Sequence, residues 1–274
     1  MPNYKTLNEL HKKMNTFRPL SKEEVESIEK DKKYDHVWSS NAIEGSSLSK
    51  YETAALLETG LTVHGKPFSD HLAALDLSRA YDYVQELATG KLPLDEIAIR
   101  DINRLVTYSD DPTKKAEAGQ YRQIKVWPNG VPEVHYTNPT DIPNEMKKLM
   151  KWYLEVEGKE HPVKIAALLH LKFVTIHPFR DGNGRTARLL MNFELVKHGY
   201  LIINIQPDKL SRNAYMEALR QAQVNKNDVP FMDLVADYEK EELDQRVDLL
   251  TRIEQERKYA QGKTRLDQFK NKYK

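Results

Sequence analysis

The chain has 274 residues, of which 39% are hydrophobic and 30% are charged, so it can bury a sizeable core and is not an intrinsically disordered polymer. Its 42 Lys and Arg residues balance 41 Asp and Glu residues, and the net charge of +1 argues against nucleic acid as a partner. The absence of cysteine excludes disulfides and thiolate catalysis. No signal peptide or apolar run of ~18 residues is present, so we expect a cytoplasmic protein without a membrane partner.

Two capping boxes mark helix starts in the first quarter of the chain. Ser21 is followed by Glu24, and Ser49 by Glu52. In this motif the hydroxyl accepts a bond from the backbone three residues on, and the glutamate side chain reaches back to the cap. The second box predicts a helix that stops near Gly60, because glycine adopts the left-handed conformation that ends helices.

Apolar periodicity predicts helices over most of the remaining chain. Ser69 is expected to cap a helix that ends at Gly90, and Pro93 suits the first turn of a helix that runs to about residue 107. The charged tail keeps helical spacing to about residue 260, and we expect it to fray beyond Gly262. The later helices are expected at about 140–157, 162–176, 184–198, 211–224 and 229–260.

The segment 121–136 departs from this helical pattern. Its residues alternate and are rich in β-branched and aromatic types, with Asn129 and Gly130 at the middle, where both tolerate the positive φ of a hairpin turn. Pro128 and Pro132 suit only an exposed edge. We therefore predict an all-α fold that carries one β-hairpin and has helical extensions at both termini.

Between two helices that are predicted to be buried lies the run 177–188, His-Pro-Phe-Arg-Asp-Gly-Asn-Gly-Arg-Thr-Ala-Arg. Gly182, Asn183 and Gly184 let backbone N–H groups converge at a helix N-terminus, where the partial positive charge favours a phosphate. The missing side chains of the two glycines allow a ligand to approach the backbone closely. The run therefore predicts an anion-binding site.

The charged side chains of the same run suit phosphate chemistry. Arg185 and Arg188 are three residues apart on the first helical turn, so both can project toward one anion. Asp181 offers a carboxylate for Mg²⁺, which accompanies nucleotide phosphates and takes only one or two protein carboxylates. His177 has an ordinary pKa near ~6.5 and can accept a proton from an attacking hydroxyl. Together these groups indicate phosphoryl or nucleotidyl transfer.

The run resembles the signature of Fic-domain proteins, His-x-Phe-x-Asp/Glu-Gly-Asn-Gly-Arg-x-x-Arg, at every specified position. The resemblance implies a compact helical fold that uses ATP with Mg²⁺ to transfer AMP to a Ser, Thr or Tyr hydroxyl of a target protein, with release of pyrophosphate. It makes His177 the general base, Asp181 the metal ligand and Gly182 to Gly184 the anion hole. Arg185 would hold the departing phosphates and Arg188 the γ-phosphate. Related Doc kinases carry Lys at the position of Gly184, so phosphate transfer is not expected.

The predicted hairpin resembles the flap that precedes the motif helix in this family. In the family the flap pairs, strand to strand, with the segment that bears the target hydroxyl, which orients the target without reading much of its sequence. The resemblance covers residues 119–136. It implies that the residues in contact with the target include Tyr121, Arg122, Ile124 and Val126.

Far upstream, residues 40–45 read Ser-Asn-Ala-Ile-Glu-Gly and resemble the family's inhibitory motif, Ser/Thr-x-x-x-Glu-Gly/Asn. Ser40 and Glu44 are four residues apart and so share one face of a helix, with Gly45 completing the motif. The resemblance implies that Glu44 pairs with Arg188 and denies this arginine to the γ-phosphate, since such a pair is strong when it is desolvated.

Beyond the motif helix the chain departs from the family. Tyr215 corresponds to the first of two tyrosines that line the adenine pocket in many members, but Met216 replaces the second and Gln223 takes the place of an asparagine. The base specificity therefore stays open. The resemblances divide the chain into an N-terminal helical region (1–60), a catalytic core (61–240) and a C-terminal helical tail (241–274).

Two other functions stay open. Glu44 would position water in a hydrolase that removes AMP from a modified protein, or nucleotide binding would act as the switch of an interaction module with little turnover. Modification of the chain itself and a homo-oligomer that gates Glu44 also stay open. A zinc site built from His135, His161 and His170 is disfavoured, because nothing resembles His-Glu-x-x-His.

Overall fold

The computed structural model describes residues 2–272 apart from 18, 91, 109–115 and 129–130, and gives the backbone alone for 260–272. The predicted all-α class is confirmed, since the described residues contain no β-strand, and none of their helices is long and apolar enough to cross a membrane. The elements in chain order are α1 (Tyr4–Met14), α2 (Lys22–Ile43), α3 (Lys50–Thr59), α4 (Phe68–Thr89), α5 (Glu96–Thr107), the short 3-10 helix η2 (Pro139–Asp141), α6 (Ile142–Val156), α7 (Pro162–Ile176), α8 (Asn183–Lys197), α9 (Lys209–Asn225) and α10 (Val229–Lys272).

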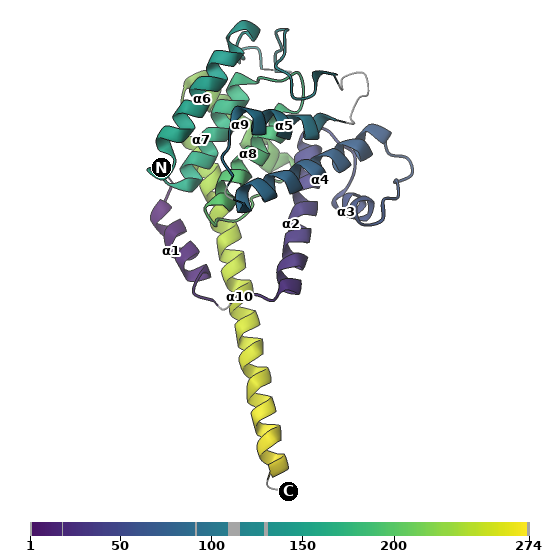
Figure 1. Cartoon of the computed structure of the whole chain (residues 1–274), viewed down its shortest axis with the longest axis vertical. Coiled ribbons are helices and arrows are strands. Elements are labelled where there is room, and N and C mark those ends of the chain that lie inside the picture. Colours follow the sequence, from purple (N-terminus) through teal and green to yellow (C-terminus); the bar gives the residue numbers. More distant parts are fainter. Residues whose placement is uncertain (1, 18, 91, 109–115, 129–130, 273–274) are drawn as a thin grey trace.

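Helices α7 and α8 lie at the centre of the molecule and pack against each other (Figure 1). Every residue of α8 from 185 to 195 is buried, so this helix has no solvent-exposed face. A helix without a polar face belongs in a protein interior. Because α2, α4 and α5 also contact α8, the side chains near its first turn can be reached from several elements.

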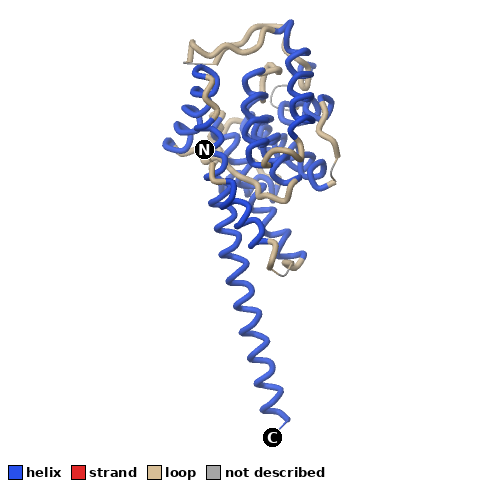
Figure 2. The backbone as a smooth tube through the Cα atoms, turned by 90° about the vertical axis from the view of Figure 1, so that its left-hand side faces the viewer, coloured by secondary structure: helices blue, strands red, loops and turns tan. Residues whose placement is uncertain are grey.

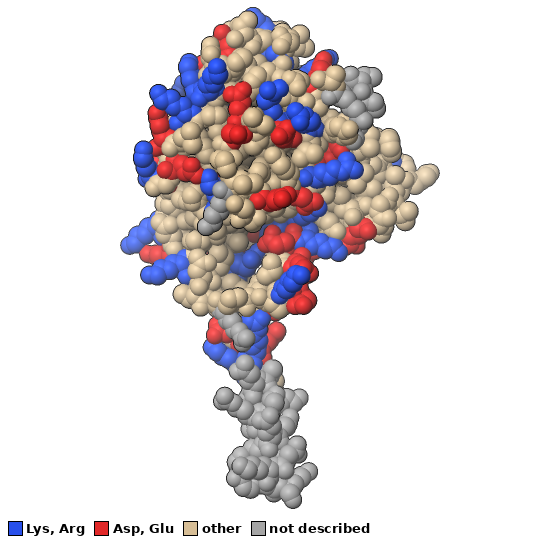
Figure 3. Space-filling view, viewed as in Figure 1, with Lys and Arg blue, Asp and Glu red and all other residues tan. Residues whose placement is uncertain are grey.

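Helix α10 begins in the core and then leaves the body as a rod, which is clear in two perpendicular views (Figures 1 and 2). Phe231 and Leu243 are fully buried, whereas Tyr259 is 79% exposed. On the face seen in Figure 3, charges of both signs are interspersed on the body and on the described part of this helix. The expected fraying beyond Gly262 is wrong, since the backbone stays helical to residue 272. One glycine costs a helix only about 1 kcal/mol relative to alanine.

Helix α1 packs against α10 and lies in the predicted N-terminal helical region, where no helix bounds were predicted before the Ser21 capping box. Its single buried apolar side chain is Leu7. Leu10 and Met14 pack on the core while partly exposed. In addition, Tyr4 stacks on His161 with centroids 4.5 Å apart, and the hydroxyl of Tyr200 donates to Asn8 Oδ1 at 2.8 Å. The partners are more than 150 residues away, so no local pattern indicates them.

The helix boundaries test the capping predictions individually. Both capping boxes are present, and Gly60 ends α3 in the left-handed conformation. The cap at Ser69 is wrong, because α4 already begins at Phe68 after Pro67. Pro93 lies outside α5, which begins after Asp95, whose Oδ1 accepts from the N–H of Ala98 at 2.7 Å. The start of α5 is therefore set by the side-chain cap at Asp95 and not by the backbone conformation of Pro93.

The predicted β-hairpin is not formed in the described part of 119–136, and its turn at Asn129 and Gly130 lies outside the described residues. The backbone there makes one isolated antiparallel bridge, from Tyr121 to Phe179. Pro128 and Pro132 lack N–H donors on both sides of the turn, which weakens any ladder between the two limbs.

A side chain takes the place of that ladder. Arg122 is only 4% exposed, and its guanidinium donates to the carbonyl of Ile124 at 2.8 Å and to the carbonyl of Thr137 at 2.5 Å. It therefore joins the beginning of the flap segment, residues 119–136, to the residue that follows its end.

Candidate active site

His177 ends α7 in the left-handed conformation, with φ 52° and ψ 58°, which is uncommon for a residue with a Cβ atom. Contacts from two sides hold this backbone. The N–H of His177 donates to the carbonyl of Phe173 at 3.0 Å, and Arg122 Nε donates to the carbonyl of His177 at 2.8 Å. Nδ1 lies 3.3 Å from the carbonyl of Val174, an acceptor, so Nδ1 carries the proton and Nε2 is left to accept one.

Burial lowers the pKa of His177 to about 4. The positive charge of Arg122 acts in the same direction, whereas the carbonyl of Val174 and the carboxylates of Glu44 and Asp181 oppose the shift. The imidazole is therefore neutral at pH 7, which is the form a general base requires.

The loop after His177 is fixed by the amide of Asn183, which pairs with the backbone of Phe179 in both directions. Its Oδ1 accepts from the N–H at 3.0 Å and its Nδ2 donates to the carbonyl at 2.8 Å. Gly182 precedes α8 with φ 75°, and a Cβ atom there would lie 2.7 Å from Thr107 Cγ2 and 3.0 Å from Asn103 Nδ2. Only glycine fits this position, which lies directly before the first N–H groups of α8.

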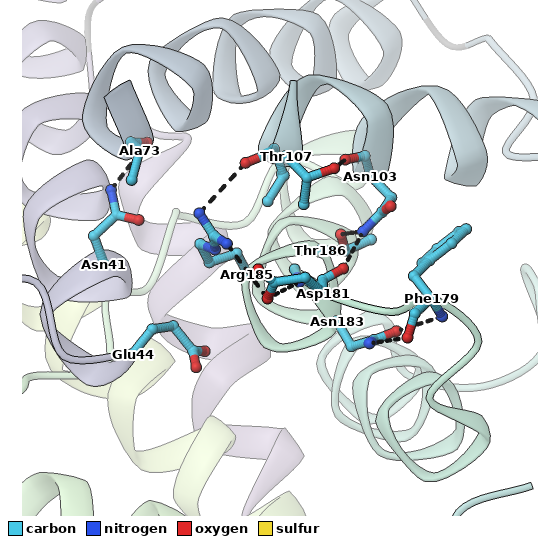
Figure 4. Close-up of polar contacts among 12 residues, drawn as sticks. Asn41, Glu44, Ala73, Asn103, Thr107, Phe179, Asp181, Asn183, Arg185 and Thr186 are labelled. Carbon is cyan, nitrogen blue, oxygen red and sulfur yellow. Dashed lines mark hydrogen bonds and ion pairs between the residues drawn. The ribbon is translucent and has the colours of Figure 1, made fainter. Parts of the chain in front are cut away.

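Asn103 of α5 is a residue that the sequence analysis missed. Its Nδ2 donates to the carbonyl of Asp181 at 2.9 Å and contacts Thr186 Oγ1 at 3.3 Å, while its Oδ1 accepts from the N–H of Gly119 at 3.2 Å. Figure 4 shows it reaching the start of α8 from the helix above. A single asparagine in an amphipathic helix gives no signal of this role, since the three partners come from distant segments.

Asp181 and Arg185 lie together at one edge of the loop. The carboxylate of Asp181 is 53% exposed, and its Oδ1 lies 2.6 Å from the N–H of Gly182 and 3.7 Å from a guanidinium nitrogen of Arg185. Arg185 is buried and also donates to the carbonyl of Val106 at 3.3 Å. A solvent-facing carboxylate thus lies beside a buried cation at the N-terminus of α8.

Arg188 lies one turn further along α8, 3% exposed. Its Nε donates to Ser40 Oγ at 2.8 Å, and one terminal nitrogen donates to the carbonyl of Ser40 at 2.8 Å and to Glu44 Oε1 at 2.7 Å. The other terminal nitrogen is 3.4 Å from the hydroxyl of Tyr215, which also contacts His170 Nε2 at 3.0 Å. The predicted contact between Glu44 and Arg188 is present, through one carboxylate oxygen.

Glu44 caps the C-terminus of α2, and its side chain is 44% exposed. Burial opposes ionisation of this carboxyl most strongly, but the attraction of Arg188 and then of Arg185 outweighs it and lowers the pKa of Glu44. A Cβ atom at Gly184 would overlap Glu44 Oε1. The carboxylate therefore lies against the first turn of α8. Figure 4 shows the Glu44 side chain at the end of α2, near the start of α8.

Comparison with known proteins identifies related sequences and structures. Residues 93–195, which contain the loop and the flap segment, match the family model described as Fic/DOC family. The chain contains a Fic/DOC-family domain. Two curated relatives named Protein adenylyltransferase Fic come from Nematostella vectensis, 38% identical over 76% of this chain and 47% of that protein, and from Culex quinquefasciatus, 36% identical over 80% and 43%. The chain thus spans less than half the length of these relatives.

Solved structures show the same fold for this Fic/DOC chain. A Fic domain containing signaling protein from Bacteroides thetaiotaomicron is 27% identical, with 90% of this chain and 98% of that chain covered at a TM-score of 0.81. Fic-1 from C. elegans is 25% identical, with 90% and 72% covered at a TM-score of 0.77. The helices outside the matched family region therefore also have counterparts in known structures.

The flap residues of this Fic domain differ in exposure. Ile124 is 53% exposed, whereas Tyr121 and Val126 are half-buried and Arg122 is buried, with its guanidinium bonded to carbonyls of its own chain. A groove of about 500 Å³ runs along this segment. The residues that line it include Arg100, Glu117, Tyr121, Arg122, Ile124 and Arg180.

The three residues at the expected adenine pocket, Tyr215, Met216 and Gln223, differ in burial and contacts. Tyr215 is 1% exposed and its hydroxyl contacts Arg188, whereas Met216 is 37% exposed and Gln223 is half-buried. Of these three residues, only Tyr215 touches the charged network at the start of α8 in the described contacts.

Proposed function

We propose that this Fic domain transfers AMP from ATP to a Ser, Thr or Tyr hydroxyl of a target protein and that Glu44 inhibits the reaction. One observation carries the proposal: a neutral imidazole with its Nε2 free to accept a proton lies beside a helix N-terminus that has two buried arginines, Arg185 and Arg188. The two relatives, each named Protein adenylyltransferase Fic, support the same reaction.

In this mechanism His177 Nε2 takes the proton of the acceptor hydroxyl as its oxygen bonds to the α-phosphorus of ATP. The bond from that phosphorus to the pyrophosphate oxygen breaks, and pyrophosphate leaves. The N–H groups at the start of α8, with Arg185 and Arg188, stabilise the negative charge of the phosphates. The protein thus supplies position and charge, which is most of what such a transfer needs.

The donor set fits one Mg²⁺ ion that arrives with the nucleotide. Asp181 has a half-exposed carboxylate at the edge of the loop, and Mg²⁺ bound to nucleotides takes one or two protein carboxylates, with the remaining ligands from phosphate and water. When bound, the ion would neutralise phosphate charge. Asp181 would hold it, while Asn103 fixes the backbone of Asp181 through its carbonyl.

Inhibition follows from the engagement of Arg188. Its guanidinium is already bonded to Ser40 and Glu44, and the carboxylate occupies the space beside Gly184 where a phosphate would approach the helix N-terminus. A carboxylate there competes with phosphate for the same donors and repels it. Removal of the carboxylate is expected to free Arg188 for the γ-phosphate.

The test uses three variants incubated with labelled ATP and Mg²⁺. Glu44→Gly should label protein, including copies of the chain itself, at least about tenfold faster than the wild type, which corresponds to about 1.4 kcal/mol of barrier. His177→Ala and the double variant should not label. Equal rates for the wild type and Glu44→Gly would reject inhibition, and labelling by the double variant would reject the role of His177. Mass spectrometry of the labelled protein identifies the modified residue type. Nucleotide binding without turnover in Glu44→Gly would favour the interaction module.

A second function, removal of AMP from a modified protein, is favoured by the position of Glu44. Its side chain is 44% exposed to water, the pKa of its carboxyl is lowered, and its charge opposes the lowering of the His177 pKa, so the two groups lie in one site. A carboxylate in that place can orient a water molecule toward the phosphorus. The test is AMP release from a modified protein: loss of release in Glu44→Gly supports hydrolysis, and unchanged release rejects it.

A further inference from the structure

Tyr136, at the end of the flap segment, stacks directly on His177. The ring centroids are 3.8 Å apart and the planes differ by 9°. Nδ1 of the imidazole also donates a hydrogen bond to the carbonyl of Val174. One face and one edge of the ring are therefore held, and the edge that carries Nε2 is left for a reactant.

The backbone beside Tyr136 and the backbone of His177 are tied by one side chain. The buried guanidinium of Arg122 donates to the carbonyl of His177 at 2.8 Å and to the carbonyl of Thr137 at 2.5 Å. Since Thr137 follows Tyr136 directly, this bridge fixes the spacing between the two stacked rings. The stack is thus maintained by the hydrogen bonds of a buried arginine and not by ring contact alone.

An aromatic ring over an imidazole acts in two ways. It restricts rotation of the imidazole about its side-chain bonds, and it removes water from one face, which disfavours the charged form. The second effect agrees with the lowered pKa of His177, which burial sets at about 4. The hydroxyl of Tyr136 stays protonated, because burial raises the pKa of this tyrosine too.

We propose that Tyr136 is a positioning residue for His177, whose ring keeps the imidazole neutral and turned so that Nε2 faces the acceptor hydroxyl. The part about the acceptor rests on the proposed function. The part about the imidazole rests on the stacking geometry alone. Two readouts therefore separate the two parts.

The first readout is the titration of the imidazole by NMR, with the His177 signal assigned by its loss in His177→Ala. In Tyr136→Ala the pKa of His177 should rise from about 4 toward the ordinary value of about 6.5, because one face of the ring gains water. Tyr136→Phe should leave it unchanged, since the ring remains. Tyr51→Ala is the matched control, because Tyr51 is a tyrosine outside the flap segment and is 86% exposed.

The second readout is AMP transfer at saturating ATP in the Glu44→Gly background. Tyr136→Ala should lower kcat on the order of 10- to 100-fold, because the imidazole is no longer held in the orientation for proton transfer. The acidic limb of the pH profile should move to higher pH, because the pKa of His177 rises. Tyr136→Phe and Tyr51→Ala should stay within about twofold of the parent, well below the effect of misplacement. Tyr136→Leu replaces the alanine variant if the latter does not fold.

The proposal is overturned if removal of the ring leaves the pKa of His177 in place, whatever happens to the rate, or if Tyr136→Phe loses as much activity as Tyr136→Ala. A parent Glu44→Gly protein that transfers no AMP would instead reject the proposed function. The NMR titration would then still decide whether Tyr136 positions the imidazole.

Discussion

The loop at 177–184 and the end of α2 meet at the first turn of α8, but the protein holds them in different ways. The loop is fixed mostly by contacts to backbone atoms: Asn183 pairs with Phe179, Asn103 holds Asp181, and Arg122 holds His177. The two bonds between Asn183 and Phe179 are buried and the other two are partly buried, so the loss of any one partner would cost stability. The loop is therefore organised before any ligand arrives.

Glu44, by contrast, reaches the site with a half-exposed side chain at the end of a helix whose first half has no buried residue. The final turns of α2 are held by separate polar contacts, such as His36 with Asn204 at 3.0 Å, Asn41 with the carbonyl of Ala73 at 3.3 Å, and Arg212 Nε with the carbonyl of Ile43 at 3.3 Å. The loop is thus built between two central helices, whereas the inhibitory carboxylate comes from a separate helix whose last turns are buried.

The largest effect is expected from Gly182→Ala, a substitution in the loop at 177–184. A Cβ atom would meet Thr107 and Asn103 and would strain a backbone with φ 75°, so we expect a loss of about 3 kcal/mol or more of unfolding free energy and no transfer in the Glu44→Gly background. Gly158→Ala is the control, since φ is 72° but nothing lies within 4 Å. It should cost only about 1–2 kcal/mol in urea denaturation. Equal costs would show that the loop is not tightly packed.

Acid should destabilise both regions. Burial lowers the pKa of His36, at the base of the α2 contacts, and of His177 to about 4 each. Between pH 4 and the ordinary pKa of about 6.5 the unfolded chain binds more protons than the folded chain, so the free energy of unfolding decreases as the pH falls through this range. For the fully buried His36 the decrease is about 3 kcal/mol at most.

The measurement for this prediction is urea denaturation at pH 7.5 and pH 4.5. His36→Gln should flatten the pH dependence, because glutamine keeps a donor for Asn204 Oδ1 but does not titrate. A wild type that is equally stable at both pH values would contradict the prediction. If His36→Gln flattens the pH dependence of the unfolding free energy, the titration of His36 on α2 accounts for it.

Asn183→Asp tests the hydrogen-bonded pair within the loop. An ionised aspartate can accept from the N–H of Phe179 but cannot donate to its carbonyl, so about 1–3 kcal/mol of stability should be lost. Asn225→Asp is the matched control, because Asn225 is exposed and contacts only Gln221 among the described hydrogen bonds. Thermal unfolding of the two variants gives the comparison, and a smaller loss at Asn183 than at Asn225 would count against a preorganised loop.

The smallest effect is expected from Ser40→Ala on the α2 side. It removes one acceptor from Arg188 but leaves the carbonyl of residue 40 and Glu44 in place, so transfer should rise by about 3- to 10-fold and stay below that of Glu44→Gly. Ser39→Ala is the control, since Ser39 is equally buried but its hydroxyl contacts the carbonyl of His36 in its own helix. An equal rise in the transfer rate for Ser39→Ala would mean that the effect comes from a general loosening of α2 and not from the contact of Ser40 with Arg188.

The amino-acid sequence alone determined the features that depend on neighbours along the chain. Both capping boxes, the bounds of α7 and the glycine-rich start of α8 follow from residues within a few positions of one another. The resemblance to a known family added the contact of Glu44 with Arg188, although 144 residues separate them.

Only the tertiary structure decided which distant side chains complete the site. Asn103 and Tyr136 belong to segments whose own patterns predicted an ordinary helix and a hairpin. Helix α1 makes a stacking contact with His161, which lies far along the chain. Hydrogen-bond and stacking partners are selected by packing in three dimensions, and a buried arginine, Arg122, replaced the strand ladder that alternation had predicted. Local periodicity carries information about backbone conformation, but not about which buried polar group a distant carbonyl will meet.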